Sequence, residues 1–241
     1  MVPEEYERMA ALEETMWWYQ GLHSNVLNAL RRHAPSVHDL LDAGCGTGGT
    51  LKMIGAAFPQ TRLHGIDLSA QACAHTRRKT GASVEVGSVE DLPYPQDSFD
   101  ALVSCDVLGY PIDVERTVAG FHRVLRPGGI CVINLAAYGW MLSYHDRAVG
   151  QVRRFNRAEA VALMRRHGLQ PLFASYWNTV LFPLMVLKRK LLPAPAASDV
   201  APVAPVVNTL FKGCLAIEST LIDRGVRLPF GGSVLIIAQK A

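Results

Sequence analysis

This sequence of 241 residues lacks paired cysteines. Its five cysteines are odd in number and scattered along the chain, without any C-x-x-C spacing: Cys45, Cys73, Cys105, Cys131 and Cys214. Neither a disulfide framework nor a zinc site has such a pattern, so we expect a reducing compartment and no bound metal.

Long hydrophobic runs, a signal-peptide pattern and a strong charge of one sign are also missing. No apolar run reaches membrane-spanning length, and the first residues, 1–5, are acidic. The formal net charge is only +3, which gives no reason to expect an extended nucleic-acid surface. We therefore expect a cytoplasmic protein that does not bind nucleic acid.

The most informative stretch is rich in glycine and covers residues 40–49, LLDAGCGTGG. Before it, residues 37–41 are typical of a short buried strand, and after it residues 50–58 are typical of a helix. The glycines thus fall in a turn between a strand and a helix, where an open parallel sheet binds nucleotide-like ligands.

The spacing of this turn discriminates between ligands. Gly44, Gly46 and Gly48 give G-x-G-x-G rather than the G-x-G-x-x-G of dinucleotide folds. Asp42 would repel a pyrophosphate but suits an ammonium group. Asp67 ends the next apolar strand, where a carboxylate can bind both hydroxyls of a ribose. An amino acid joined to a nucleoside without phosphate is S-adenosylmethionine, which we predict as the cofactor, with S-adenosylhomocysteine as the product.

Four segments in order carry a family resemblance: LLDAGCGTGG, GIDLS, VEDLPYPQDSFDALVS and FHRVLRPGGICVINL. Over residues 37–135 the chain resembles class I S-adenosylmethionine-dependent methyltransferases of the type-11 group. The resemblance implies an α/β fold, a Rossmann-like doubly wound sheet of seven strands. It also implies that the last strand, at 233–239, inserts antiparallel between the fifth and sixth.

The resemblance and the glycine turn together predict the cofactor contacts. Many relatives have an aspartate at Ser88, where a serine hydroxyl accepts a hydrogen bond more weakly; Glu90 is an alternative partner for the adenine. The predicted cofactor-binding residues are Asp42, Gly44, Cys45, Gly46, Thr47, Gly48, Asp67, Leu68, Ser88, Val89, Glu90 and Cys105.

The N-terminal arm is predicted to be one helix over residues 4–32, with an aromatic cluster at residues 16–19. Two interpretations stay open: a staple that fixes the arm to the core, or a lid over the cofactor. In the lid, Trp18 and Tyr19 are the expected contacts.

Candidate catalytic and substrate residues lie mainly after the fifth strand. His145 is a candidate general base, because neutral imidazole accepts a proton near pH 7, and Asp146 could orient it or act instead. A loop histidine beside a solvated acid is the alternative. Further candidates for the substrate pocket are Tyr110, Tyr144, Arg153 and Asn178.

The chain divides into an arm (1–36), a cofactor-binding core (37–177), a helical, proline-rich insertion (178–232) and the last core strand (233–241). The insertion begins with an apolar and then basic segment, 181–192. This segment could pack on the sheet, line a hydrophobic substrate site, form a homodimer contact or touch a membrane surface weakly.

These features predict an enzyme that methylates O, N or C of a small, partly hydrophobic metabolite, such as a natural-product or lipid-type intermediate. One alternative is a regulatory or assembly protein that binds the cofactor without methylating. Another is an RNA or protein methyltransferase, but no N-P-P-[YF] tetrapeptide follows the strand at 99–105.

Overall fold

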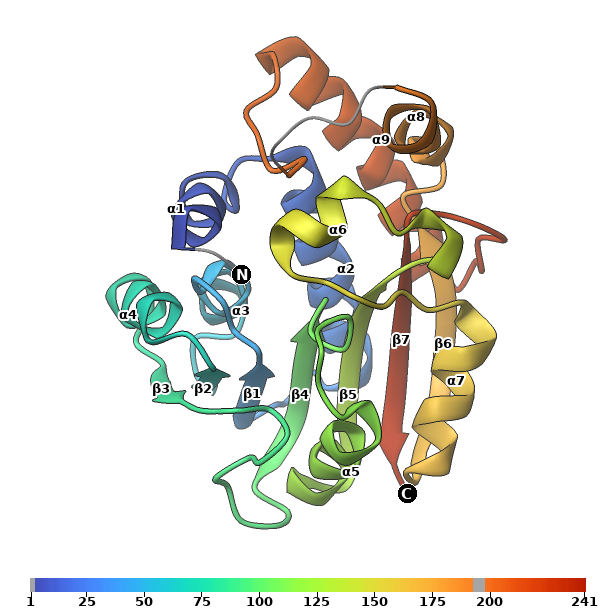
Figure 1. The fold of residues 1–241 in the computed structure, drawn as a ribbon. Helices are drawn as coiled ribbons and strands as arrows, with labels where there is room; N and C mark the ends of the chain where they lie inside the picture. The colour runs from blue at the N-terminus through green and yellow to red at the C-terminus, as the bar shows by residue number, and fades with distance from the viewer. Residues whose placement is uncertain (1–2, 193–197) are drawn as a thin grey trace.

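The computed structural model describes residues 3–192 and 198–241, and in these residues seven strands form one mixed sheet (Figure 1). The strands are β1 (Asp39–Ala43), β2 (Arg62–Asp67), β3 (Ser83–Val86), β4 (Phe99–Cys105), β5 (Leu125–Ala136), β6 (Leu169–Trp177) and β7 (Ser233–Lys240). Their order in the sheet is β3-β2-β1-β4-β5-β7-β6.

The last strand runs against its neighbours. β7 pairs antiparallel with β5 and β6, so Ile236 lies opposite Ile133 on one side and Ala174 on the other. The pairs of β1, β2, β3, β4 and β5 are parallel. The predicted fold class, including the antiparallel insertion of the last strand, is confirmed.

The strand order also locates the site. From β1 the chain moves outward to β2 and β3, then returns to place β4 on the other side of β1. Ligands of open α/β sheets bind outside the carboxyl ends of the strands at such a reversal. The glycine turn after β1 and the residues after β4 therefore face the same crevice.

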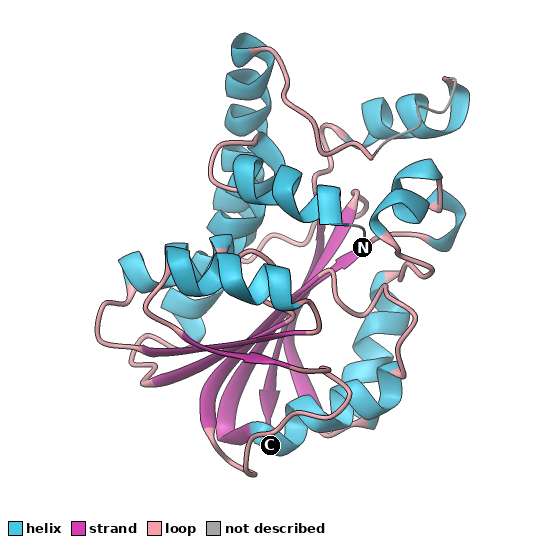
Figure 2. Ribbon diagram, turned by 60° about the vertical axis from the view of Figure 1, so that its left-hand side comes forward, coloured by secondary structure: helices cyan, strands magenta, loops and turns pink. Residues whose placement is uncertain are grey.

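Helices cover both faces of the sheet (Figure 2). The helices are α1 (Pro3–Leu12), α2 (Trp17–His33), α3 (Gly49–Ala57), α4 (Ala70–Lys79), α5 (Val114–Val124), α6 (Tyr144–Val149), α7 (Arg157–Arg166), α8 (Phe182–Val186) and α9 (Pro205–Asp223), with a 3₁₀ turn η1 (Gly139–Met141) and a π-helical turn η2 (Leu187–Leu191).

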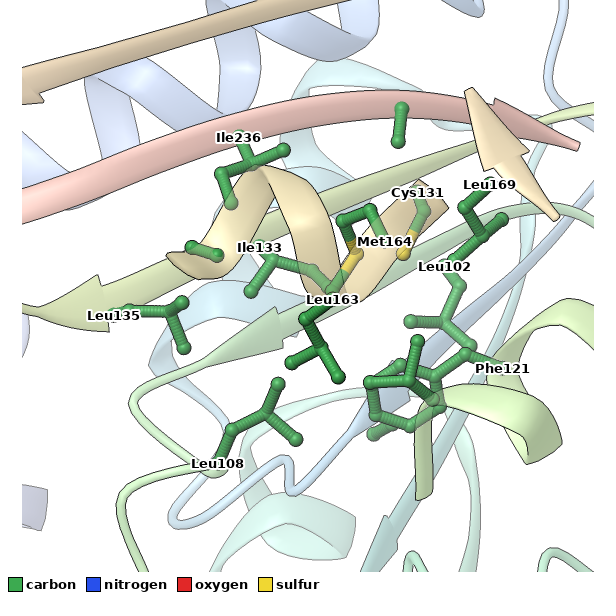
Figure 3. Packing of buried hydrophobic residues seen from close by; sticks show 14 of the residues in the cluster. Leu102, Leu108, Phe121, Cys131, Ile133, Leu135, Leu163, Met164, Leu169 and Ile236 are labelled. Atoms are coloured by element: carbon green, nitrogen blue, oxygen red, sulfur yellow. The ribbon is translucent and has the colours of Figure 1, made fainter. Parts of the chain in front are cut away.

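Two hydrophobic clusters hold these layers together. In the first, Phe121 of α5 and Leu163 of α7 pack with Leu102 and Ile133 of the sheet (Figure 3). In the second, residues of α2, α3 and α9, among them Leu215, pack on the opposite face. Burial of one such side chain contributes about 1.5–3 kcal/mol, so both faces of the sheet are strongly fixed.

The prediction of one continuous N-terminal helix is wrong, because the arm breaks between α1 and α2. At the break, the buried Glu13 accepts a hydrogen bond from the Gly49 amide (3.0 Å) and forms an ion pair with Lys79. An unpaired amide and the positive helix dipole at the start of α3 favour a carboxylate there. This tertiary contact directs the chain away from a straight helix.

The insertion packs on the arm. Gly21 of α2 lies so close to α9 that an added Cβ would be 2.5 Å from Leu215 Cδ1. Of the segment 181–192, Leu181 is buried, whereas Leu184 is 49% exposed and Leu191 is 73% exposed. Two prolines of the predicted proline-rich insertion, Pro193 and Pro195, lie outside the described residues. In the described residues no helix is long and apolar enough to cross a membrane.

Candidate functional site

A cavity of about 800 Å³ lies at the carboxyl ends of β1 and β4. Three regions line it: the arm, the core turns and the insertion. The lining residues include Tyr6, Met9, Glu13, Trp18 and Tyr19 of the arm, Asp42, Gly44, Cys45, Gly46, Thr47, Asp67, Leu68, Ser88, Val89, Glu90, Cys105, Asp106 and Tyr110 of the core, and Leu181, Leu184, Met185, Lys188, Arg189, Val203 and Phe211 of the insertion.

The glycine turn is held by backbone geometry that other residues tolerate poorly. Gly44 has φ of +88°, and an added Cβ would lie 2.2 Å from Val107 Cγ2. Asp67 at the end of β2 fixes the turn, because its two carboxylate oxygens accept from the amides of Gly46 and Ser69, both at 2.9 Å. Gly48 lies outside the cavity lining, where an added Cβ would be 2.9 Å from Thr76 Cα of α4. We correct its predicted role accordingly: it permits close helix packing.

Three acidic side chains, Asp42, Asp67 and Glu13, gather at this end of the cavity. Asp42 is 2% exposed, and burial, followed by the charges of Asp67 and Glu13, raises its pKa to about 8. Burial also raises the pKa of Asp67, although the hydrogen bonds from the Ser69 and Gly46 amides partly lower it. In the described part of the chain no donor bonds to the Asp42 carboxylate, and Thr47 Oγ1 is buried without a partner. A cationic ligand with polar groups would satisfy both.

The turn after β3 is ordered by its own side chains. Ser88 Oγ accepts from the amide of Glu90 (3.1 Å), and Glu90 Oε1 accepts from the amide of Asp113 (2.8 Å). Glu90 is therefore anchored at the cavity rather than being a solvated loop charge. Leu68 is 77% exposed and lies at the rim.

The comparisons with known proteins agree with this geometry. Residues 41–133 match the family described as a methyltransferase domain. A Mycolicibacterium smegmatis protein named as a probable S-adenosylmethionine-dependent methyltransferase is 29% identical over 162 residues, covering 66% of this chain and 62% of that protein. Residues 41–133 of this chain therefore form a methyltransferase domain of the S-adenosylmethionine-dependent type. The chain spans less than two thirds of the length of that relative.

Two solved structures share the fold of this chain. One is a Haloferax volcanii protein named as a methyltransferase and solved with the Trm112 methyltransferase activator; it has a TM-score of 0.65 at 21% identity and covers 100% of this chain and 97% of its own. The other is geranyl diphosphate C-methyltransferase from Streptomyces coelicolor A3(2), with Mg²⁺, geranyl diphosphate and S-adenosylhomocysteine; its TM-score is 0.58 at 19% identity, over 88% of this chain and 75% of that one.

The residues of the aromatic cluster in the arm differ in their contacts, which bear on the staple and lid interpretations. Trp17 packs edge-on against Phe211 of α9, with ring centroids 5.3 Å apart, as a staple would. Trp18 stacks on Trp177 of β6 at 5.8 Å, and both Trp18 and Tyr19 line the cavity. Their contact with a cofactor stays a prediction.

Sequence reasoning missed the contribution of α1 to the cavity. Met9 lies over the glycine turn, its Cε 3.0 Å from the position of a Cβ on Gly46. Tyr6 lines the cavity near Asp67, and Glu13 caps α3. No motif marks these residues, because their partners lie more than thirty positions away.

The candidate base His145 lines the cavity, but its hydrogen bonding does not suit a base. Its Nδ1 accepts from the amide of Asp199 (3.0 Å), and burial lowers its pKa to about 3. A neutral imidazole whose Nδ1 accepts carries its proton on Nε2. His145 therefore presents a donor to its surroundings.

Asp146 has a different place from the one expected, and this corrects its assignment as a catalytic residue. Its carboxylate is fully buried, accepts from Ser143 and forms an ion pair with Arg154 (2.7 Å), and it is not among the cavity lining. It fixes α6 through a capping box, and the ion pair offsets the burial of both charges.

Two of the four predicted substrate residues line the cavity and two do not. Tyr110 and Asn178 line the cavity, and Asn178 is 1% exposed with φ of +59°. Tyr144 does not line it; its hydroxyl donates to Asp199 (2.7 Å). Arg153 is exposed and borders a separate hollow beside α5 and α7, whereas its neighbour Arg154 lines the main cavity. These two assignments are corrected.

No group of three or more metal-ligating side chains occurs among residues 3–192 and 198–241. Cys105 lines the cavity, but burial, with the nearby charges of Asp42 and Asp106, raises its pKa well above the usual value. A buried thiol of this kind is inert.

Proposed function

We propose that this methyltransferase transfers the methyl group of S-adenosylmethionine to an O, N or C atom of a small, partly hydrophobic acceptor. One observation carries the proposal: a single cavity joins the acidic glycine turn to an apolar wall supplied by the insertion. Such a cavity accommodates a polar cofactor at one end and an apolar acceptor at the other.

The residues at the acidic end fit the cofactor. Asp42 suits the ammonium group of its methionine part, since a cation would lower the carboxylate's raised pKa and restore its charge. Each oxygen of Asp67 keeps a second lone pair for a ribose hydroxyl after accepting from the backbone. Val89, Ser88 and Glu90 are suitably placed for the adenine.

The bound cofactor supplies an electrophilic methyl group, and the protein has to align the acceptor with it and exclude water. The arm and the insertion both contribute side chains that exclude water from the cavity. Trp18 is stacked on Trp177, and Phe211 holds Trp17 in place, so the aromatic wall of the cavity is rigid.

The acceptor class follows from the insertion wall. Its lining side chains are mostly apolar, with Leu181, Met185 and Phe211 among them, and they bind the body of a hydrophobic molecule. The related fold of geranyl diphosphate C-methyltransferase, whose acceptor has an apolar chain, supports this class.

Calorimetric titration of ligand-free protein with S-adenosylmethionine and S-adenosylhomocysteine tests the proposal. We expect dissociation constants in the micromolar range, about −8 kcal/mol. Methyl-labelled cofactor should then label hydrophobic small molecules and leave RNA and protein unlabelled. Cofactor binding without transfer to any acceptor would favour a regulatory or assembly role, and no binding would reject the cofactor.

A further inference from the structure

Asp106 occupies a strained position in the wall of the cavity. It is the first residue after β4 and has φ of +58°, in the left-handed region that residues other than glycine rarely adopt. Its amide donates to the carbonyl of Asn134 (2.9 Å) and its carbonyl accepts from Gln151 Nε2 (3.0 Å). Such strain costs about 1–3 kcal/mol and is concentrated at functional sites.

A buried relay fixes one oxygen of its carboxylate. Trp177 Nε1, which can only donate, bonds to Asn134 Oδ1 at 2.7 Å. The amide nitrogen of Asn134 therefore faces Asp106, and it donates to Oδ2 at 3.0 Å. Asn134 is fully buried and Trp177 is 1% exposed, so the carboxylate is held by rigid neighbours.

The other oxygen lacks a partner. Asp106 Oδ1 is buried and accepts no hydrogen bond from the described residues, although the residue lines the cavity. An unsatisfied buried acceptor costs about 1–3 kcal/mol, which a ligand with an O–H group would recover. The terminal torsion of aspartate is soft, and the role proposed below requires a rotation of the carboxylate that presents this oxygen to the cavity.

The surrounding groups hold the pKa of the Asp106 carboxylate close to neutral pH. Burial raises the pKa of Asp106 to about 7, against the hydrogen bond from Asn134 and the charge of Arg154, while Asp146 raises it further. Tyr19, Tyr110 and Cys105 face it from the arm and the core, and burial raises the pKa of each, so all three remain protonated near pH 7.

We propose that Asp106 is the general base of this site and that the acceptor is a hydroxyl compound with an apolar body. The inference rests on the proposed function. During transfer the acceptor oxygen forms a bond to the methyl carbon and the sulfur–methyl bond breaks. The hydroxyl proton passes to Asp106 Oδ1 and later to solvent, and S-adenosylhomocysteine leaves with the bond's electron pair on sulfur.

The other titratable groups of the cavity suit this role less well. His145 presents its donor nitrogen, because Nδ1 already accepts from Asp199. Asp42 lies beside the glycine turn, where the cofactor's cation is expected. Asp106 combines a fixed carboxylate with an oxygen that lacks a donor.

The first test compares Asp106→Asn with Asp42→Asn. Both proteins are titrated with S-adenosylmethionine and assayed with methyl-labelled cofactor on a panel of alkyl-substituted phenols and catechols. We expect Asp106→Asn to lower kcat by about 10²–10⁴-fold while its dissociation constant for the cofactor stays within about twofold of the wild type. Asp42→Asn should chiefly weaken cofactor binding.

The wild-type rate should rise with pH through an inflection near pH 7, and Asp106→Asn should lose this inflection. Weaker cofactor binding by Asp106→Asn, an unchanged rate, or a wild-type enzyme that binds cofactor but methylates no hydroxyl compound would each overturn the proposal. If the wild type fails to bind cofactor, the proposed function itself fails.

A second readout needs no ligand. A folded-state pKa near 7, above about 3.9 in the unfolded chain, favours the protonated acid in the fold, so its contribution to stability is lost as pH rises through 7. Asparagine resembles the protonated acid and does not titrate. The Tm of Asp106→Asn minus that of the wild type should therefore rise by several degrees between about pH 5 and pH 8; a constant difference would overturn the assignment.

Discussion

The two ends of the cavity are built in opposite ways. The glycine-turn end comes from consecutive strand–turn–helix units, and its acids, Asp42 and Asp67, lie twenty-five positions apart on paired strands. The insertion end is assembled from the arm and α9, where Trp17 and Phe211 meet across almost the whole chain. Local sequence specifies the first end, and tertiary packing specifies the second.

The ends also differ in charge. At the glycine turn, Asp42 has neither a donor nor a cation bonded to it in the described residues. At the insertion, the three charged residues of the lining pair with one another: Arg189 Nε lies 2.7 Å from Asp199 Oδ2, and Lys188 Nζ lies 2.9 Å from Asp199 Oδ1. The guanidinium and its neighbours hold the pKa of Asp199 well below its usual range. A cation is therefore favoured at one end, and we propose that the apolar acceptor binds at the other.

We expect the largest difference between the two ends when one glycine at each end is replaced by alanine. Gly44→Ala adds a Cβ 2.2 Å from Val107 at positive φ, so we expect a loss of about 2–5 kcal/mol in the free energy of unfolding. Gly213→Ala in α9 meets nothing within 4 Å and should instead stabilise by up to about 1 kcal/mol. Urea denaturation of both variants measures the difference; equal stabilities would show that the turn is less constrained than its geometry indicates.

Asp67→Ala should act on the cofactor end alone. The turn loses two backbone hydrogen bonds and the ribose loses its acceptor, so we expect cofactor affinity to fall by about ten- to a hundredfold, or 1.5–3 kcal/mol. Calorimetry measures the affinity, with Asp91→Ala as the control because its side chain is 85% exposed. Unchanged affinity in Asp67→Ala would remove this residue from the site.

Met185→Glu should act on the insertion end alone. A charge on the apolar wall opposes burial of the acceptor, and we expect KM for a hydrophobic acceptor to rise by at least about tenfold, with cofactor affinity unchanged. Leu191→Glu, on a side chain that is 73% exposed and outside the lining, is the control. Weaker cofactor binding by Met185→Glu would mean that the two ends are not independent.

The smallest effect should come from His145→Asn. The pKa of His145 is lowered to about 3, so the ring is neutral from acid to alkaline pH and loses no proton near neutrality. Asparagine can still accept from the Asp199 amide through its own carbonyl oxygen. The measurement is the methylation rate of His145→Asn and of the wild type across pH. We expect the same inflection in both, with only a modest loss of rate in the variant. Disappearance of the inflection would restore His145 as the base.

The sequence predicted the fold because its strands are short apolar runs with turn residues between them. The stretch at 99–105 is a strand with the expected bounds, and the glycine turn follows β1 as expected. Most of the predicted cofactor residues of this turn, Asp42, Gly44, Cys45, Gly46 and Thr47, line the cavity because neighbouring parallel strands end at one edge. Periodicity along the chain is sufficient for such features.

What was missed depends on contacts between distant residues. Nothing near Glu13 indicates that it caps α3, and the choice between Arg153 and Arg154 depends on which side of an irregular loop faces inward. Asp106 stands in an evident place after β4, but its significance comes from Asn134 and Trp177, which are more than twenty-five positions away. The residues adjacent to Glu13, Arg154 and Asp106 in the sequence do not indicate these contacts.

The position of β7 has a consequence for how the chain folds. Because β7 lies between β5 and β6, β6 cannot join the sheet until residues 233–240 have been synthesised. Trp177, at the end of β6, can therefore take up its hydrogen bond to Asn134 only late in folding. The glycine turn needs only neighbouring strands, so the cofactor end can form first, and the relay behind Asp106 is completed when the last strand docks.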